Sequence, residues 1–360
     1  MDVSLFGGAY GGRRVLVTGH TGFKGSWLAL WLRELGARVS GIALPPSTTP
    51  SHWELLGLAD VDSREIDVRD GESIRRAVAE IDPEIVFHMA AQPLVRRSYR
   101  DPLETWSTNV MGTANVLEAC RHAPGVRAIV VVTTDKCYEN REWPWGYRET
   151  DPLGGHDPYS ASKAAAELVA ASFRSAFFGD RVLVATARAG NVIGGGDWSE
   201  DRLLCDLVRA VAAGIELEIR SPDATRPWQH VLESLSAYLL LGQRLLAGEA
   251  RFAGPWNIGP EPEANRRVAD VLAALRAHWP ELSWRTTAQP QPHEANLLYL
   301  DAAKAKALLG WQTVWRLDEG LRRTADWYRA YLGGGAVHSR AQLAAYVDGA
   351  RAAGCSWVSR

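Results

Sequence analysis

One stretch near the start of the chain constrains the fold more than any other, and it runs from Arg14 to Gly36. Its first five residues, Arg14–Thr18, are rich in valine, which is typical of a strand buried on both faces. Three glycines follow in the spacing G-x-x-G-x-x-G, at Gly19, Gly22 and Gly25. The leucines and tryptophans after them fall on one stripe of a helix that ends near Gly36. This strand, glycine turn and helix predict a dinucleotide-binding corner, because glycine allows close approach to a pyrophosphate and the helix N-terminus offers free N–H groups.

Buried strands and amphipathic helices alternate over the following 150 residues. We expect strands at 38–44, 85–89, 128–132 and 182–187, and helices at 102–121 and 158–178. That alternation predicts an α/β fold, a doubly wound parallel sheet of the Rossmann type.

The pattern changes after Arg188, where a glycine-rich loop begins and prolines become frequent. We therefore divide the chain into a dinucleotide-binding Rossmann domain, a smaller substrate-binding domain, and a linker with a terminal helix at about 339–352. The expected bounds are 1–189 for the first (with segments near 228–259 returning to it), 190–332 for the second and 333–360 for the third.

Composition excludes several classes of partner. The formal net charge is only -2 and no long like-charge run is present, so we expect no nucleic acid and no anionic membrane surface as partners. Apolar runs are too short to span a bilayer, and the first twelve residues do not resemble a signal peptide. The four cysteines are scattered and lack metal-ligand spacing, which suits a reducing compartment. We expect a cytoplasmic protein without a metal.

Two segments at the ends of expected strands are candidates for contact with a dinucleotide. No acid follows the second strand, where the chain reads Leu44-Pro-Pro-Ser-Thr-Thr, so the choice between NAD and NADP stays open. Asp67 is either a hydrogen-bond acceptor for adenine or a cap for the helix after it. The small residues after strand 85–89 either let the backbone pass a cofactor or only pack tightly.

A polar cluster follows the strand Ala128–Val132, beginning Thr133-Thr134-Asp135-Lys136. Open parallel sheets bind ligands at this end of their strands. Further along, Tyr159 and Lys163 are four residues apart on one helix and share a face. We expect the ammonium group to lower the tyrosine pKa, which would make the phenol a proton acceptor near neutrality.

Five motifs together carry a family resemblance: TGHTGFKG, HMAAQPLV, TTDKCYENREWPWGYRE, DPYSASKAAAE and RAGNVIGGGDW. They resemble the extended short-chain dehydrogenase/reductase family, over residues 13–331, and within it the nucleotide-sugar 4,6-dehydratases. The resemblance implies NAD as cofactor and a nucleotide sugar, CDP-glucose, as substrate. It also implies oxidation at C4, elimination of water across C5 and C6, and return of hydride to C6. The expected assembly is a homodimer or homotetramer in which the helices 102–121 and 158–178 pair with those of a second copy.

The resemblance also implies roles for individual residues. Catalysis is assigned to Thr134, Asp135, Lys136, Tyr159 and Lys163. Substrate binding is assigned to Asn191, Arg202, Arg226 and Tyr299. Contacts with the cofactor are assigned to Gly19, Thr21, Gly22, Phe23, Gly25, Asp67, Val68, Ala90, Ala91, Gln92, Asn109, Thr133, Tyr159 and Lys163. One departure is that relatives acting on dTDP-sugars have Asp-Glu after the threonine, whereas this chain has Asp135-Lys136.

Two other functions remain open. A 4-epimerase or a decarboxylating relative would keep the threonine, tyrosine and lysine but would not need an acid and a base after Thr134. A catalytically silent NAD(P)-binding regulator would have no use for a poised phenol. The sequence favours the dehydratase.

Overall fold

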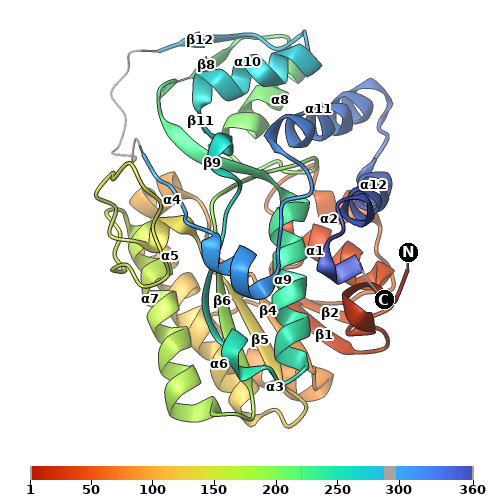
Figure 1. Cartoon of the computed structure of the whole chain (residues 1–360), viewed down its shortest axis with the longest axis vertical. Helices are drawn as coiled ribbons and strands as arrows, with labels where there is room; N and C mark the ends of the chain where they lie inside the picture. Colours follow the sequence, from red (N-terminus) through yellow and green to blue (C-terminus); the bar gives the residue numbers. More distant parts are fainter. Residues whose placement is uncertain (1, 220, 288–296, 359–360) are drawn as a thin grey trace.

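The computed structural model describes residues 2–219, 221–287 and 297–358. Its main element is a seven-stranded sheet in the order β10-β6-β5-β4-β1-β2-β3, in which every neighbouring pair is parallel (Figure 1). The strands are β1 (Arg14–Thr18), β2 (Arg38–Ala43), β3 (Asp62–Glu65), β4 (Ile85–His88), β5 (Ala128–Val132), β6 (Leu183–Ala189) and β10 (Gly254–Ile258). The expected doubly wound Rossmann sheet is confirmed.

Helices cover both faces of this sheet and enclose two apolar cores. One core joins β-strand side chains to α1, α9 and α12, and the other joins them to α3, α6 and α7. The bounds are α1 (Phe23–Glu34), α3 (Gly71–Ile81), α6 (Gly112–His122), α7 (Pro158–Phe173), α9 (Val231–Leu246) and α12 (Ser339–Ala352). Shorter helices between them are α2 (His52–Leu56), α4 (Val95–Arg100) and α5 (Pro102–Trp106).

The helix expected over 102–121 is continuous but not uniform. α5 passes into α6 through a π-helical turn at Ser107–Met111, and α7 likewise ends in a π-helical turn at Arg174–Phe178. Such turns add a residue to the helical repeat and are frequent near functional sites. The sequence periodicity did not indicate them.

A second group of elements packs around its own apolar core at one end of the sheet (Figure 1). A three-stranded sheet, β11-β9-β7, and a strand pair, β12-β8, are packed with three helices there. The elements are β7 (Asn191–Ile193), α8 (Leu203–Ala213), β8 (Leu217–Ile219), β9 (Thr225–His230), β11 (Asn265–Arg267), α10 (Val268–His278), β12 (Trp284–Thr286) and α11 (Leu317–Gly334). Between β9 and β11 the chain returns to the large sheet as α9 and β10.

The C-terminal segment differs in one respect from the expected linker and helix. Gly333 and Gly334 belong to α11, and the helix ends only at Gly335, which adopts a left-handed conformation with φ of 77°. α12 then has the expected bounds and packs against the core formed by α1 and α9. No helix in the described ranges is long and apolar enough to cross a membrane.

Candidate active site

A cavity of about 1320 Å³ lies at the carboxyl ends of β1, β2, β4, β5 and β6 and extends toward the elements of the second core. Open α/β sheets bind ligands at this position. Most of the residues assigned to catalysis and binding line it. These are Gly19, Thr21, Gly22, Phe23, Gly25, Asp67, Val68, Ala90, Ala91, Gln92, Thr133, Thr134, Asp135, Lys136, Tyr159, Lys163, Asn191, Arg202 and Arg226.

Each of the three glycines of the corner is favoured at its position for a different structural reason. Gly19 has a φ of 75°, and a Cβ there would lie 2.8 Å from the backbone of Ala90. A Cβ on Gly25 would collide with the carbonyl oxygen of Gly19. Gly22, the N-cap of α1, has an ordinary φ of -78°, and its Cβ would approach only the Gly19 oxygen, at 3.4 Å. Gly22 therefore keeps the cavity side of the helix N-terminus open, which fits a dinucleotide pyrophosphate.

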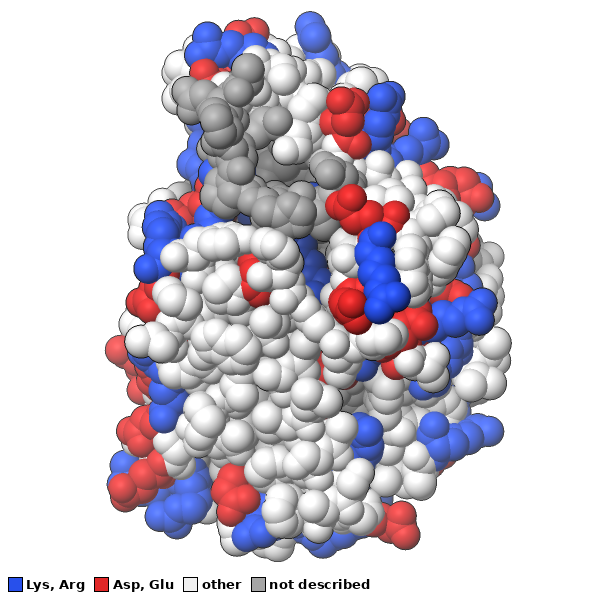
Figure 2. Space-filling model, turned by 90° about the vertical axis from the view of Figure 1, so that its left-hand side faces the viewer, with Lys and Arg blue, Asp and Glu red and all other residues white. Residues whose placement is uncertain are grey.

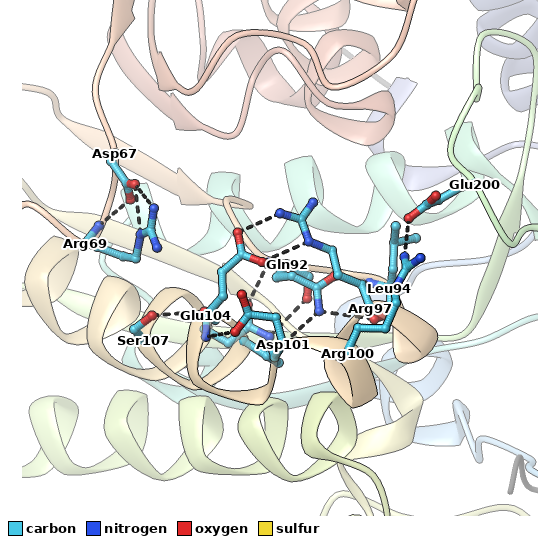
Figure 3. A network of polar contacts seen from close by, with 12 residues as sticks. Asp67, Arg69, Gln92, Leu94, Arg97, Arg100, Asp101, Glu104, Ser107 and Glu200 are labelled. Carbon is cyan, nitrogen blue, oxygen red and sulfur yellow. Dashed lines mark hydrogen bonds and ion pairs between the residues drawn. The ribbon is translucent and has the colours of Figure 1, made fainter. Parts of the chain in front are cut away.

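Asp67 lies at the edge of the cavity, paired with Arg69 at 2.5 Å (Figure 3). The hydrogen bonds from Arg69 hold the pKa of the Asp67 carboxyl below its usual range. The helix after it is capped by Asp70, whose side chain accepts a hydrogen bond from the Ser73 N–H at 3.1 Å. Asp67 is therefore not the cap, and contact with adenine stays a prediction.

Asn109 and Tyr299 do not line the cavity. Asn109 is buried in the π-helical turn, where it donates to the Gln92 carbonyl at 3.1 Å and to Ser162 Oγ at 2.8 Å. Through the first of these bonds, Asn109 holds the backbone of Gln92, which lines the cavity. The backbone of Tyr299 pairs with Tyr147, whose N–H donates to the Tyr299 carbonyl at 2.9 Å, so this residue belongs to a neighbouring segment.

Tyr159 and Lys163 lie in the first turns of α7, which begins at the capping residue Asp157. Burial raises the pKa of Tyr159 to about 12, and a hydrogen bond with Thr134 opposes this. Burial also lowers the pKa of Lys163 to about 8, and its Nζ donates to the Val132 carbonyl at 3.0 Å. The expected lowering of the tyrosine pKa is therefore wrong for this structure, because desolvation of the phenolate outweighs the attraction of nearby cations.

Asp135 is the most buried acid of the cavity, with 1% of its surface exposed. Its Oδ1 accepts a hydrogen bond from Thr134 Oγ1 at 3.0 Å, and its Oδ2 has no hydrogen-bond partner among the described residues. Burial raises the pKa of this carboxyl, against the opposing charges of Lys136, Arg226 and Lys24. A carboxyl in such surroundings is suited to donate a proton. Lys136 follows it on the same short turn and is only partly buried.

Two arginines lie on the side of the cavity formed by the second group of elements. Arg202 pairs with Asp197 at 2.8 Å, and Arg226 is buried on β9 with its Nη1 donating to the Thr225 carbonyl at 2.9 Å. Guanidinium groups in this position can pair bidentately with phosphate oxygens.

Lys24 was not predicted from the sequence as a site residue, and it lies in the first turn of α1 and lines the cavity. Burial and the charge of Arg202 lower the pKa of its ammonium group to about 7. Its position in the site could have been inferred from the sequence, because a lysine between the last two glycines of the corner lies at the N-terminus of the helix.

The arginines of α4 were missed as well. Arg97 binds Glu104 through two hydrogen bonds of 2.9 and 2.7 Å, and Arg100 reaches Glu200 at 2.7 Å (Figure 3). Glu200 lines the cavity and precedes α8, so the second of these pairs joins α4 to the segment before α8. The segment VRRSYR gave no helical or ligand pattern that pointed to this arrangement.

The fold and the cavity define a dinucleotide-binding enzyme of the extended short-chain dehydrogenase/reductase class. The family model described as GDP-mannose 4,6 dehydratase matches residues 16–324, and the chain belongs to that family. The chain is 50% identical over 331 residues to a CDP-glucose 4,6-dehydratase of Salmonella typhimurium, covering 90% of this chain and 92% of the relative. It is 28% identical over 339 residues to a dTDP-glucose 4,6-dehydratase of Xanthomonas campestris, covering 87% and 92%.

Solved structures show the same fold. The UDP-glucose 4-epimerase of Thermus thermophilus in complex with NAD superimposes with a TM-score of 0.75 at 26% identity, over 88% of this chain and 98% of that one. The epimerase is more distant in sequence than the Salmonella dehydratase.

Proposed function

We propose that the chain is an NAD-dependent nucleotide-sugar 4,6-dehydratase that converts CDP-glucose to CDP-4-keto-6-deoxyglucose. The 50% identity to a CDP-glucose 4,6-dehydratase over nine-tenths of the chain carries this proposal. The cavity supports it, because it gathers Thr134, Asp135, Lys136, Tyr159 and Lys163 at one end of β5 and the start of α7.

Oxidation and elimination need different residues. NAD, held at the cavity by residues such as Gly19, Gly22 and Ala90, would supply the hydride acceptor for oxidation at C4 and the hydride donor for reduction at C6. Tyr159 takes the proton of the C4 hydroxyl, and a hydrogen bond with Thr134 favours the ionised phenol. Lys163 follows Tyr159 by four residues on the same helix and places its amine on the same face. The resulting ketone acidifies the C5 proton, which is removed by Lys136 or by a water or carboxylate that Lys136 positions, while Asp135 protonates the departing C6 hydroxyl. Arg202 and Arg226 hold the diphosphate of the sugar nucleotide.

NAD fits the end of β2 better than NADP. Residues 43–48 line the cavity there and read Ala-Leu-Pro-Pro-Ser-Thr, without a lysine or arginine to neutralise a 2′-phosphate. Arg69 lies nearby but is paired with Asp67.

The test is to incubate the chain with CDP-, dTDP-, UDP- and GDP-glucose, each with NAD or with NADP, and to weigh the products. We expect CDP-glucose with NAD to give a product lighter by one water. An isomer of unchanged mass would support the epimerase instead, and no turnover of any of the four sugars would overturn the proposal.

We also propose that two copies associate through α5, its π-helical turn and α7. Apolar side chains are exposed there at Leu103, Trp106, Met111, Leu168 and Phe177. Figure 2 shows a broad area almost free of charged side chains on the side of the molecule where α5 and α7 lie. An exposed apolar area of this kind is typical of a subunit interface.

Sedimentation should therefore give a mass at least twice the 39.5 kDa of one chain at micromolar concentration. Replacing Leu168, which is 61% exposed, by glutamate should shift the distribution toward monomer, because a charge would be buried at the interface. A mass of 39.5 kDa for the unaltered chain would contradict the assignment.

A further inference from the structure

A buried ion pair lies directly behind the catalytic residues. Glu167 on α7 and Arg188 on β6 are 2.8 Å apart, and each side chain is only 3% exposed. Burying two opposite charges is costly in desolvation, and the mechanism above uses neither residue. The role of Glu167 and Arg188 can be inferred from the residues that they contact.

The contacts of Glu167 join α7 to the residue that follows β5 and to β6. Its Oε1 accepts a hydrogen bond from Thr133 Oγ1 at 2.5 Å, and its Oε2 accepts one from Thr186 Oγ1 at 2.7 Å. Arg188 donates in turn to the Tyr138 hydroxyl at 2.8 Å. Thr133 lines the cavity and immediately precedes the catalytic Thr134.

Glu167 also shares a helical face with the two catalytic residues of α7. Tyr159, Lys163 and Glu167 follow one another at intervals of four, so Lys163 lies between the phenol and the carboxylate. Burial lowers the pKa of Lys163, and the charge of Glu167 is the largest effect that opposes it.

The other titratable groups around this pair cannot replace the carboxylate. Burial lowers the pKa of His88 to about 3 and raises that of Cys137 well above its usual value, so both are neutral near pH 7. Three further charged groups interact with Lys163 or Glu167: Lys24 with Lys163, and Arg188 and Arg174 with Glu167. All three are cations.

We propose that Glu167, paired with Arg188, is a positioning residue that supports the charged form of Lys163 and holds Thr133 in place beside the catalytic threonine. The expected effect on turnover rests on the proposed function. The protonation of Lys163, in contrast, can be measured without substrate. The proposed reaction needs a protonated Lys163. Loss of the Glu167 carboxylate should lower the pKa of Lys163, so activity should be lost at a lower pH on the alkaline side of the pH profile.

The composition of the chain makes the measurement direct. It contains five lysines, namely Lys24, Lys136, Lys163, Lys304 and Lys306. Carbon-13 labelling of lysine Cε therefore gives a spectrum of five resonances, which single lysine-to-arginine substitutions assign. The pH titration of the Lys163 resonance in the full chain reports its protonation.

Glu167→Gln preserves the shape of the side chain and removes its charge. We expect the titration midpoint of Lys163 to fall by about one pH unit, and the alkaline limb of CDP-glucose turnover to move down by the same amount. The double variant E167Q/R188M, which removes both charges, should return the midpoint most of the way. Thr186→Val is the matched control, because it removes one hydrogen bond to Glu167 but no charged side chain. It should leave the titration midpoint of Lys163 unchanged.

An unchanged Lys163 midpoint in a folded E167Q chain, with or without a lower melting temperature, overturns the proposal and leaves a purely structural pair. If E167Q does not fold, Glu167→Asp retracts the carboxylate by one methylene and should give a smaller fall, and an unchanged midpoint there is equally decisive. A failure of the unaltered chain to dehydrate any sugar nucleotide would overturn the proposed function but would not alter the titration result.

Discussion

We expect Gly22→Val to abolish NAD binding while the chain remains folded. The backbone at Gly22 has φ of -78° and ψ of 169°, an extended conformation that valine adopts readily. Among the described residues its Cβ would meet only the Gly19 oxygen, at 3.4 Å. The rest of the branched side chain must then project over the N-terminus of α1, where a pyrophosphate would bind. A clash of this kind costs about 3 kcal/mol, which corresponds to more than about 100-fold in Kd.

Isothermal titration with NAD, together with circular dichroism, separates binding from folding. Gly333→Val is a matched control, because Gly333 lies on α11 and no atom of the part of the chain that the structure describes comes within 4 Å of its Cβ position. That variant should retain full affinity. Gly25→Ala should instead destabilise the fold, because its Cβ collides with backbone atoms. A folded Gly22→Val chain with unchanged NAD affinity would show that the pyrophosphate does not bind at this corner.

The centre of the large sheet could be predicted from the sequence because β1, β4 and β5 are short runs of mostly buried apolar residues, many of them β-branched. Ala128–Val132 has the expected bounds, and the strand expected at 85–89 ends one residue earlier. These runs lie between two helical layers, so each must be apolar throughout. The π-helical turns could not be predicted in this way, since their side chains have no periodicity distinct from that of the helices on either side.

The site could be predicted best where polar side chains directly follow a buried strand of the parallel sheet. Thr134, Asp135 and Lys136 follow a buried strand, and such strand ends form the ligand-binding edge of a parallel sheet. The pKa of Tyr159 was predicted with the wrong sign because burial, which determines it, depends on residues distant in sequence. The pair of Glu167 and Arg188 was not predicted either, because they are 21 positions apart and meet only when α7 packs on β6.

Asp135→Asn and Lys136→Met should stop the reaction after its first step. Oxidation at C4 depends on Tyr159, Lys163 and Thr134, which these substitutions leave in place. Only elimination needs an acid for the C6 hydroxyl and a base for the C5 proton. Asparagine keeps the shape of Asp135 but cannot donate a proton as an acid, and methionine removes the amine of Lys136. General acid or base catalysis is worth about 10²–10⁴-fold, so we expect losses of that order in product formation for each variant.

Rapid mixing with CDP-glucose distinguishes the steps, because NADH absorbs at a wavelength where NAD does not. In Asp135→Asn and Lys136→Met, NADH and a 4-keto-glucose nucleotide should accumulate while the dehydrated product forms slowly. Tyr159→Phe should show no NADH at all, since the C4 hydroxyl then lacks its proton acceptor and hydride transfer cannot begin. The assignment depends on Asp135 being buried with Oδ2 unpartnered among the described residues, and on Lys136 lying beside it. Full formation of the 4-keto-6-deoxy product by both Asp135→Asn and Lys136→Met would show that other groups perform the elimination, and Lys24 on the same cavity wall would be the next residue to replace.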